Sequence, residues 1–366
     1  MKELFPSYYP KANEQLQGLW DKGLFVLDAS VLLKLYELTP TTRREFMRVL
    51  KRIANRIWVP YEVASEYQGN RIQVIQKQLK MADSVLETLK QIKKNVQNAL
   101  PKEHPFVDAE SVEEIIKACQ RAIRKLKRRE GEYRRLLEHD VIREELDRLL
   151  SGRIGEPYDT ARLIEICEIA QKRYRARIPP GYADESKTGG NPFGDVIIWF
   201  QIIDKAKVSK RPIIFVTDDR KEDWWINTGA GELNPRQELI DEIKHKAGTA
   251  LYMYTPATFF KEASVYLQRR VPKDTIDELA RLAKWEYVEA LKQIASQLEA
   301  QLPPTYYLKE ALKLVEEMQA GPSRSMQESL KALQQYYQSL VLPRIVLPWL
   351  GPEISPTGEG STEPED

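Results

Sequence analysis

Four short apolar runs are spaced along the chain, and each is bounded by turn residues. They cover residues 24–27, 57–59, 213–216 and 251–254. Runs this short that are β-branched or aromatic are typical of buried parallel strands. Helical periodicity lies between them, over residues 42–54, 159–176, 195–207 and 236–247. The first of these helices carries Thr42 and Glu45, which have the spacing of a capping box. Strands alternating with helices predict an α/β fold with a mostly parallel sheet, sandwiched by helices.

Two longer helical stretches do not fit a compact α/β unit. Apolar residues follow a heptad seam over 72–100, and after a break at 101–108 a second seam covers 116–137. Two such seams joined by a short loop predict an antiparallel helical hairpin inserted between the second and third strands. A hairpin can satisfy its own seam, or two chains can share it, so a homo-oligomer stays an open alternative.

The length of 366 residues exceeds one ordinary core, and the pattern predicts how the chain is divided. We expect an α/β domain over 1–270, with the hairpin inserted at about 68–157. Residues 271–342 form a predicted all-helical region, a candidate surface for an inhibitor or effector protein. Residues 343–366, rich in proline and acidic at the end, are predicted to be disordered.

Composition excludes several classes of protein. Hydrophobic residues make up 42% and charged residues 30%, which indicates a globular chain rather than a disordered one. No run of about 18 apolar residues predicts a membrane span, and the first residues lack the apolar core of a secretory signal. We therefore expect a cytoplasmic protein with no membrane contact. The two cysteines, Cys119 and Cys167, are too few for a disulfide framework or a Cys-rich zinc site.

Acidic side chains gather where the predicted strands end or the next helices begin. They are Asp28, Glu66, Asp195, Asp218, Asp219 and Asp223. In an open α/β sheet the carboxyl ends of the strands form one edge, where sites occur. Oxygen ligands select Mg²⁺ or Mn²⁺ rather than zinc, and two such ions can stabilise both oxygens of a phosphodiester during cleavage. A single Asp after a strand is also a common turn former or N-cap, so the prediction depends on the set.

Four segments resemble motifs of the PIN-domain nuclease superfamily. They are residues 27–33, residues 57–60 with 63–66, residues 180–187 with 194–199, and residues 214–225. The first has an apolar strand, Asp28, one residue, Ser30 and an apolar helix; the last is the most specific. Together they span roughly 24–260 and are similar to a large bacterial PIN-like branch, although small PIN toxins lack the hairpin.

The resemblance implies a parallel-sheet α/β sandwich whose acids bind divalent metal. Residue by residue, the acids that match the family's metal ligands are Asp28, Glu66, Asp195 and Asp219. Asp218 or Asp223 is expected to substitute or assist. Neighbouring side chains along a strand point to opposite faces, so only one of Asp218 and Asp219 is expected to ligate metal directly. Ser30 either orients Asp28 or caps the following helix.

Candidate substrate contacts lie near the acids and on the hairpin. Asn70 and Arg71 follow Glu66 by about one helical turn, and Lys187 precedes Asp195. Basic residues dominate 117–135. Four of them share one helical face, called the basic face below: Arg121, Arg124, Lys125 and Arg128. A nucleic-acid backbone is the natural partner of such a face, and a solvated outer surface of the hairpin is the alternative.

The resemblance thus implies a divalent-metal-dependent endonuclease that cleaves RNA or single-stranded DNA and leaves 5′-phosphate and 3′-hydroxyl ends. Small stand-alone relatives serve as toxins or in phage defence, and we expect a similar role. The alternative is a non-catalytic PIN-like scaffold that binds nucleic acid or oligomerises. A phosphatase of the haloacid dehalogenase type is disfavoured, because Ser30 stands where that family needs a second Asp.

Overall fold

A parallel four-stranded sheet forms the centre of the computed structural model. The structure describes residues 1, 4–5, 8–9, 13–99, 109–185, 191–227, 233–268 and 271–282. The strands are β1 (Leu24–Leu27), β2 (Ile57–Trp58), β3 (Ile213–Val216) and β6 (Leu251–Tyr254). Their order in the sheet is β2-β1-β3-β6 and every neighbouring pair is parallel, which confirms the predicted sheet. A separate antiparallel pair, β4 (Trp225–Asn227) and β5 (Leu233–Pro235), was not predicted.

Helices cover both faces of the sheet. Those before and within the hairpin are α1 (Asn13–Lys22), α2 (Ala29–Leu33), α3 (Pro40–Arg52), α4 (Tyr61–Ala99) and α5 (Ala109–Arg135). Those after it are α6 (Val141–Leu150), α7 (Thr160–Arg175), α8 (Gly194–Ser209), α9 (Gln237–Ala247) and α10 (Pro256–Tyr266). Short 3₁₀ turns are η2 (Lys34–Tyr36), η3 (Ala54–Arg56) and η4 (Tyr182–Asp184).

Aromatic side chains show how the two faces are filled. Phe25 of β1 packs on Trp20 of α1, with ring centroids 5.2 Å apart, and on Phe259 of α10 at 6.0 Å. Phe215 of β3 is in register with Val26 and therefore belongs to the opposite face. It contacts Trp224 at 5.2 Å, and Trp224 packs edge-on against Trp199 of α8. The core is thus a sheet between two helical layers, as predicted.

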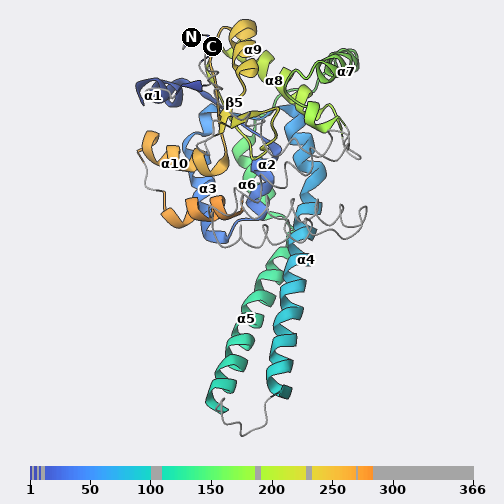
Figure 1. Ribbon diagram of the computed structural model, residues 1–366, viewed down its shortest axis with the longest axis vertical. Helices are drawn as coiled ribbons and strands as arrows, with labels where there is room; N and C mark the ends of the chain where they lie inside the picture. The colour runs from blue at the N-terminus through green and yellow to red at the C-terminus, as the bar shows by residue number, and fades with distance from the viewer. Residues whose placement is uncertain are drawn as a thin grey trace, which may run out of the picture.

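Helices α4 and α5 project from this core as a long arm (Figure 1). Leu79, Leu86 and Cys119 are buried along the arm, and an ion pair of 3.8 Å joins Arg134 of α5 to Asp83 of α4. The predicted hairpin is therefore present. The helix that follows β2 and the first helix of the arm are one element, α4, because buried apolar residues recur at helical spacing from Val63 through Tyr67 to Ile75.

The predicted capping box at the start of α3 is wrong. The helix begins earlier, at Pro40, and Thr39 caps it by accepting a hydrogen bond from the Thr42 amide. The Thr42 hydroxyl instead donates to Glu278 at 2.6 Å. Glu278 also accepts from the Thr39 amide at 2.7 Å and the Thr39 hydroxyl at 2.8 Å. In a local capping box the acidic partner would be Glu45. Here Glu278, from a distant segment, is the acidic partner instead.

These contacts attach residues 271–282 to the core, where Val271 and Leu279 are buried. The predicted C-terminal helices beyond residue 282 and the predicted disordered tail lie outside the described residues. No helix in the described ranges combines the length and the apolar content that a membrane span requires.

Candidate active site

The order of the strands brings two acidic segments together. Strand β1 lies between β2 on one side and β3 on the other. The carboxyl ends of β1 and β3 therefore form the switch point at which α/β folds bind ligands. Asp28 directly follows β1, and its amide donates to the carbonyl of Val216 at the end of β3, at 3.0 Å. Asp218 and Asp219 follow the same end of β3.

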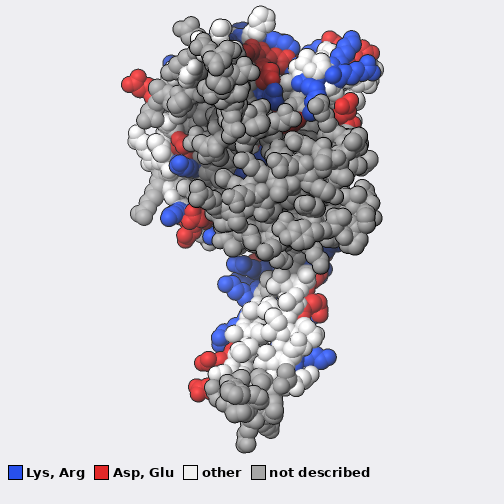
Figure 2. Space-filling model, in the orientation of Figure 1, with Lys and Arg blue, Asp and Glu red and all other residues white. Residues whose placement is uncertain are grey.

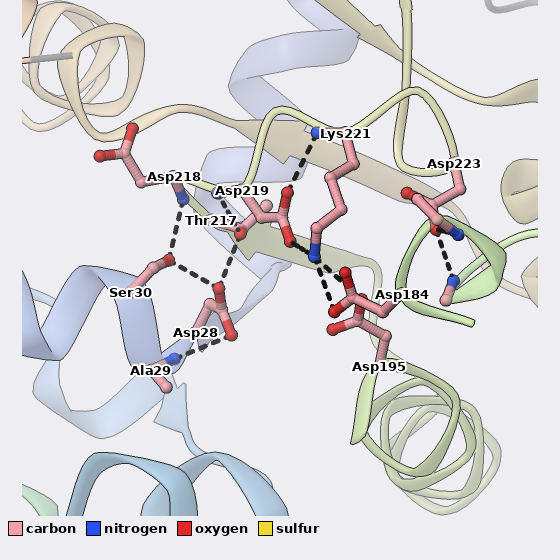
Figure 3. A network of polar contacts seen from close by, with 12 residues as sticks. Asp28, Ala29, Ser30, Asp184, Asp195, Thr217, Asp218, Asp219, Lys221 and Asp223 are labelled. Carbon is pink, nitrogen blue, oxygen red and sulfur yellow. Dashed lines mark hydrogen bonds and ion pairs between the residues drawn. The ribbon is translucent and has the colours of Figure 1, made fainter. Parts of the chain in front are cut away.

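Three donors fix the carboxylate of Asp28 (Figure 3). They are the Ala29 amide at 2.8 Å, the Ser30 hydroxyl at 2.6 Å and the Thr217 hydroxyl at 2.7 Å. Burial raises the pKa of Asp28, and the hydrogen bonds from Ser30 and Thr217 oppose that shift. The N-cap of α2 is Asp28 and not Ser30. Ser30 instead orients Asp28 and accepts a hydrogen bond from the Asp218 amide at 3.0 Å.

The hydroxyl of Thr217 connects Asp28 to Asp219. It donates to Asp28 and accepts from the Asp219 amide at 3.0 Å. Thr217, which follows β3, therefore fixes the position of Asp28 relative to Asp219.

An ammonium group lies among the remaining carboxylates. The Nζ atom of Lys221 is 2.6 Å from Asp219 Oδ2, 3.0 Å from Asp184 Oδ2 and 3.6 Å from Asp195 Oδ2. Burial lowers the pKa of Lys221, but the attraction of Asp195, Asp219 and Asp184 outweighs burial and raises it above its usual value. Lys221 therefore stays charged. Figure 3 shows the three acids converging on it from different segments of the chain.

Asp195 lies in the first turn of α8, where a helix N-terminus favours negative charge. Its Oδ2 atom is buried and has no hydrogen-bond partner among the described residues. Burial raises the pKa of Asp195 well above its ordinary value, Lys221 opposes the shift, and repulsion from Asp219 and Asp184 adds to it. Asp195 Oδ2 is therefore a buried oxygen that is held near the Lys221 ammonium but lacks a hydrogen bond within the described residues.

Asp223 is fully buried and positions the loop that carries Asp184. Its Oδ2 accepts from the Gly181 amide at 2.7 Å and the Ala183 amide at 3.1 Å. Gly181 has φ of +96°, and a Cβ there would lie 2.6 Å from the Tyr174 hydroxyl, so the turn requires glycine. Burial raises the pKa of Asp223. Its Oδ1 is a second buried carboxylate oxygen that lacks a hydrogen-bond partner in the described part of the chain.

The adjacent acids Asp218 and Asp219 point in different directions (Figure 3). Asp218 Oδ2 forms an ion pair of 2.5 Å with the buried ammonium of Lys34. Asp219 faces Lys221. The expectation that only one of Asp218 and Asp219 ligates metal directly stays a prediction.

The other predicted site residues are Glu66, Asn70 and Arg71, which lie on α4, and Lys187. Glu66 is exposed on α4, and Asn70 is partly buried one turn later. Arg71 forms an ion pair of 2.6 Å with Asp140, the N-cap of α6. Roles for these residues in the site stay predictions, and Lys187 lies outside the described residues.

All four members of the basic face are exposed on α5. Figure 2 shows basic side chains along the arm. Arg128 also pairs with Glu132 one turn later, at 3.3 Å. The face is therefore accessible to a polyanion, and its contact with nucleic acid stays a prediction.

The acid cluster consists of the carboxylates of Asp28, Asp184, Asp195 and Asp219. Its oxygen donors can be compared with the ligands that a divalent cation prefers. Within the described residues, no three carboxylate, imidazole or thiol side chains are grouped as ligands of one metal ion. The acids surround the ammonium of Lys221 instead. Their donors are all carboxylate oxygens, which suit Mg²⁺ or Mn²⁺, and the buried Asp195 Oδ2 retains unused lone pairs. The donor set fits such an ion if the ammonium leaves its position.

A family model described as a PIN like domain matches residues 24–239, more than half of the chain. The chain belongs to this family. The match extends from β1 into α9, so it includes the arm and the whole acid cluster. Proteins with PIN domains are generally nucleases. No protein of curated function and no solved structure matches the sequence.

Three residues of the cluster were not predicted from the sequence: Thr217, Asp184 and Lys221. Thr217 and Lys221 belong to the same motif as Asp219, and Asp184 belongs to the motif before α8. The one signal in the sequence was a lysine two positions after a predicted metal ligand. The position of the Lys221 side chain among acids from three segments depends on tertiary contacts between those segments, which no local sequence pattern encodes.

Proposed function

We propose that this chain is an endonuclease that depends on Mg²⁺ or Mn²⁺ and hydrolyses phosphodiester bonds in RNA or single-stranded DNA. One observation carries the proposal. Carboxylates of Asp28, Asp195 and Asp219 gather at the switch point of β1 and β3 in a PIN-like domain, and one buried oxygen of Asp195 has no hydrogen-bond partner among the described residues. Carboxylates that are crowded at such a position repel one another and favour a cation.

The chain's own residues have distinct roles in this proposal. Asp28, Asp195 and Asp219 hold the cation, with Glu66, Asp218 and Asp223 as the further acids predicted from the sequence. Ser30 and Thr217 keep Asp28 in one orientation through hydrogen bonds of 2.6 and 2.7 Å. When bound, the divalent ion supplies positive charge to the phosphate and acidifies the attacking water. Asn70, Arg71, Lys187 and the basic face are the candidate contacts for the substrate backbone.

A non-catalytic scaffold is the second candidate, and one observation favours it. The ammonium of Lys221 already neutralises part of the acidic cluster. A site that is permanently compensated in this way would bind nucleic acid through the arm without turnover.

Cleavage assays distinguish the two candidates. Purified protein is incubated with end-labelled single- and double-stranded RNA and DNA in Mg²⁺, Mn²⁺ or EDTA, and binding is followed by fluorescence anisotropy in parallel. An endonuclease produces internal cleavage with either metal and none in EDTA, with 5′-phosphate ends on the products. Binding without cleavage in every metal would support the scaffold.

Family membership also leads us to propose a role as a toxin or phage-defence effector. Expression in a bacterial host would test this role through growth arrest or phage resistance.

A further inference from the structure

The side chain of Lys221 occupies the place that the acids would offer to a free cation. Its ammonium contacts carboxylates from three segments: the loop after β3, the 3₁₀ turn η4 and the start of α8. The side chain is mostly buried, with 19% of its surface exposed. One tethered positive charge therefore connects parts of the chain that are far apart in sequence.

A metal ion and this ammonium compete for the same carboxylate oxygens. The Lys221 Nζ atom lies 2.6 Å from Asp219 Oδ2. Mg²⁺ would bind that oxygen at about 2.1 Å, which brings the two cations into direct repulsion. Each cation therefore weakens the binding of the other at these oxygens.

The backbone around Lys221 is held independently of its ammonium. The Lys221 amide donates to Asp219 Oδ1 at 3.0 Å, and the Trp225 indole donates to the Asp219 carbonyl at 2.6 Å. Lysine has a flexible four-carbon stem. The ammonium can therefore leave the acids by side-chain rotation while the loop keeps its shape.

We propose that Lys221 is an internal counter-ion that preassembles the acidic site, and that a divalent cation binds only after displacing its ammonium. This inference rests on the proposed function, because it assumes that the acids bind metal. Without the metal, the ammonium offsets repulsion among Asp184, Asp195 and Asp219 and holds them together. The displacement makes the apparent metal affinity weaker than the acids alone would give.

Calorimetric titration of Mn²⁺ tests the displacement. The proteins are the wild type, Lys221→Met and the matched control Arg220→Met. Arg220 is the preceding residue and lies 3.8 Å from Asp218, so its removal deletes one positive charge from the same loop without vacating the position among the three acids. We expect Lys221→Met to bind Mn²⁺ about tenfold more tightly than the wild type. This factor corresponds to a wild type in which the ammonium occupies the acids in about nine-tenths of the molecules, so that about one-tenth can bind the metal. Arg220→Met should change the affinity by less than about threefold, because an exposed charge is largely screened.

Thermal unfolding with and without Mn²⁺ supplies a second measurement. Without metal, Lys221→Met should melt at a lower temperature than the wild type, and Mn²⁺ should raise its melting temperature by more than it raises that of the wild type. If Lys221→Met is too unstable for calorimetry, Lys221→Gln takes its place.

The outcomes separate this inference from the proposed function. If the wild type binds Mn²⁺ and cleaves nucleic acid but Lys221→Met binds no more tightly than Arg220→Met, displacement is wrong and the nuclease remains. If neither the wild type nor Lys221→Met binds Mn²⁺, the inference and the metal-dependent function are both overturned.

Discussion

Replacing Asp195 with asparagine removes one negative charge from the acids around Lys221 and keeps the size of the side chain. The carboxylate approaches the ammonium at 3.6 Å, and its buried Oδ2 has no hydrogen-bond partner in the described residues. If Asp195 holds a divalent cation, its charge stabilises the transition state through that cation. A contribution of about 3–4 kcal/mol corresponds to roughly 150–900-fold in rate, so we expect Asp195→Asn to lose cleavage by that factor.

The same substitution should leave the fold as stable as before or more stable. Asparagine removes a buried charge and its repulsion from Asp219 and Asp184, and the lost attraction to Lys221 offsets part of that relief. We expect a net gain of about 1 kcal/mol in the free energy of unfolding at neutral pH, or roughly 2–4 °C in melting temperature.

The gain should depend on pH. Burial and the neighbouring acids raise the pKa of Asp195 well above its ordinary value of 3.8. The protonated form is therefore favoured in the folded state, and the stability of the wild type falls as the pH rises from 3.8 through the raised pKa. Asparagine does not ionise, so the advantage of the variant is absent below 3.8 and grows above it.

The assay compares single-turnover cleavage in Mn²⁺ with denaturant unfolding at several pH values. Asp204→Asn is the matched control, because Asp204 lies on the same helix and pairs with Lys207 away from the cluster. It should cleave as the wild type does. If Asp195→Asn also cleaves at the wild-type rate, Asp195 has no role in the site and the nuclease assignment built around it fails.

Three further changes test other parts of the account. Ser30→Ala removes a donor to Asp28 and should lower the Mn²⁺-dependent cleavage rate roughly 10–100-fold; an unchanged rate in the same gel assay would exclude an orienting role. Charge reversal at the basic face should weaken binding of single-stranded RNA and reduce its salt slope by about 0.7 for each phosphate that the face no longer neutralises. Anisotropy titrations at several salt concentrations measure this, and an unchanged slope would assign the basic face to the solvated surface. Glu278→Ala should cost about 1–2 kcal/mol in denaturant unfolding, because Glu278 accepts three hydrogen bonds at the start of α3, while cleavage stays unchanged. Full stability in this variant would refute the importance of those hydrogen bonds.

The elements that sequence analysis predicted well are those whose pattern is local. Each of the four strands is a continuous apolar run, so its period and length identify it without knowledge of its neighbours. Asp28 and Asp219 were predicted together because the carboxyl ends of parallel strands meet at one edge. The arm was predicted from its heptad seams, which require no partner outside the two helices.

The elements that escaped prediction depend on contacts between distant segments. Thr42 has the spacing of a capping box, but its hydroxyl donates to Glu278, 236 residues later. Arg71 on α4 forms an ion pair with Asp140 at the start of α6, a contact that no local pattern indicates, and its role towards substrate stays a prediction. Lys221 meets acids from three segments, and no local pattern encodes that meeting.

We propose above that the acids at the carboxyl ends of β1 and β3 form one metal-dependent phosphodiesterase site. Asp219 is the acid nearest to Lys221, at 2.6 Å, and Thr217 connects its backbone to Asp28. The most direct test is the single-turnover cleavage rate of Asp219→Asn on end-labelled RNA or single-stranded DNA in Mn²⁺, with circular dichroism to verify folding. We expect a folded protein that cleaves at least about 100-fold more slowly than the wild type. A folded Asp219→Asn protein that cleaves at the wild-type rate would contradict this proposal.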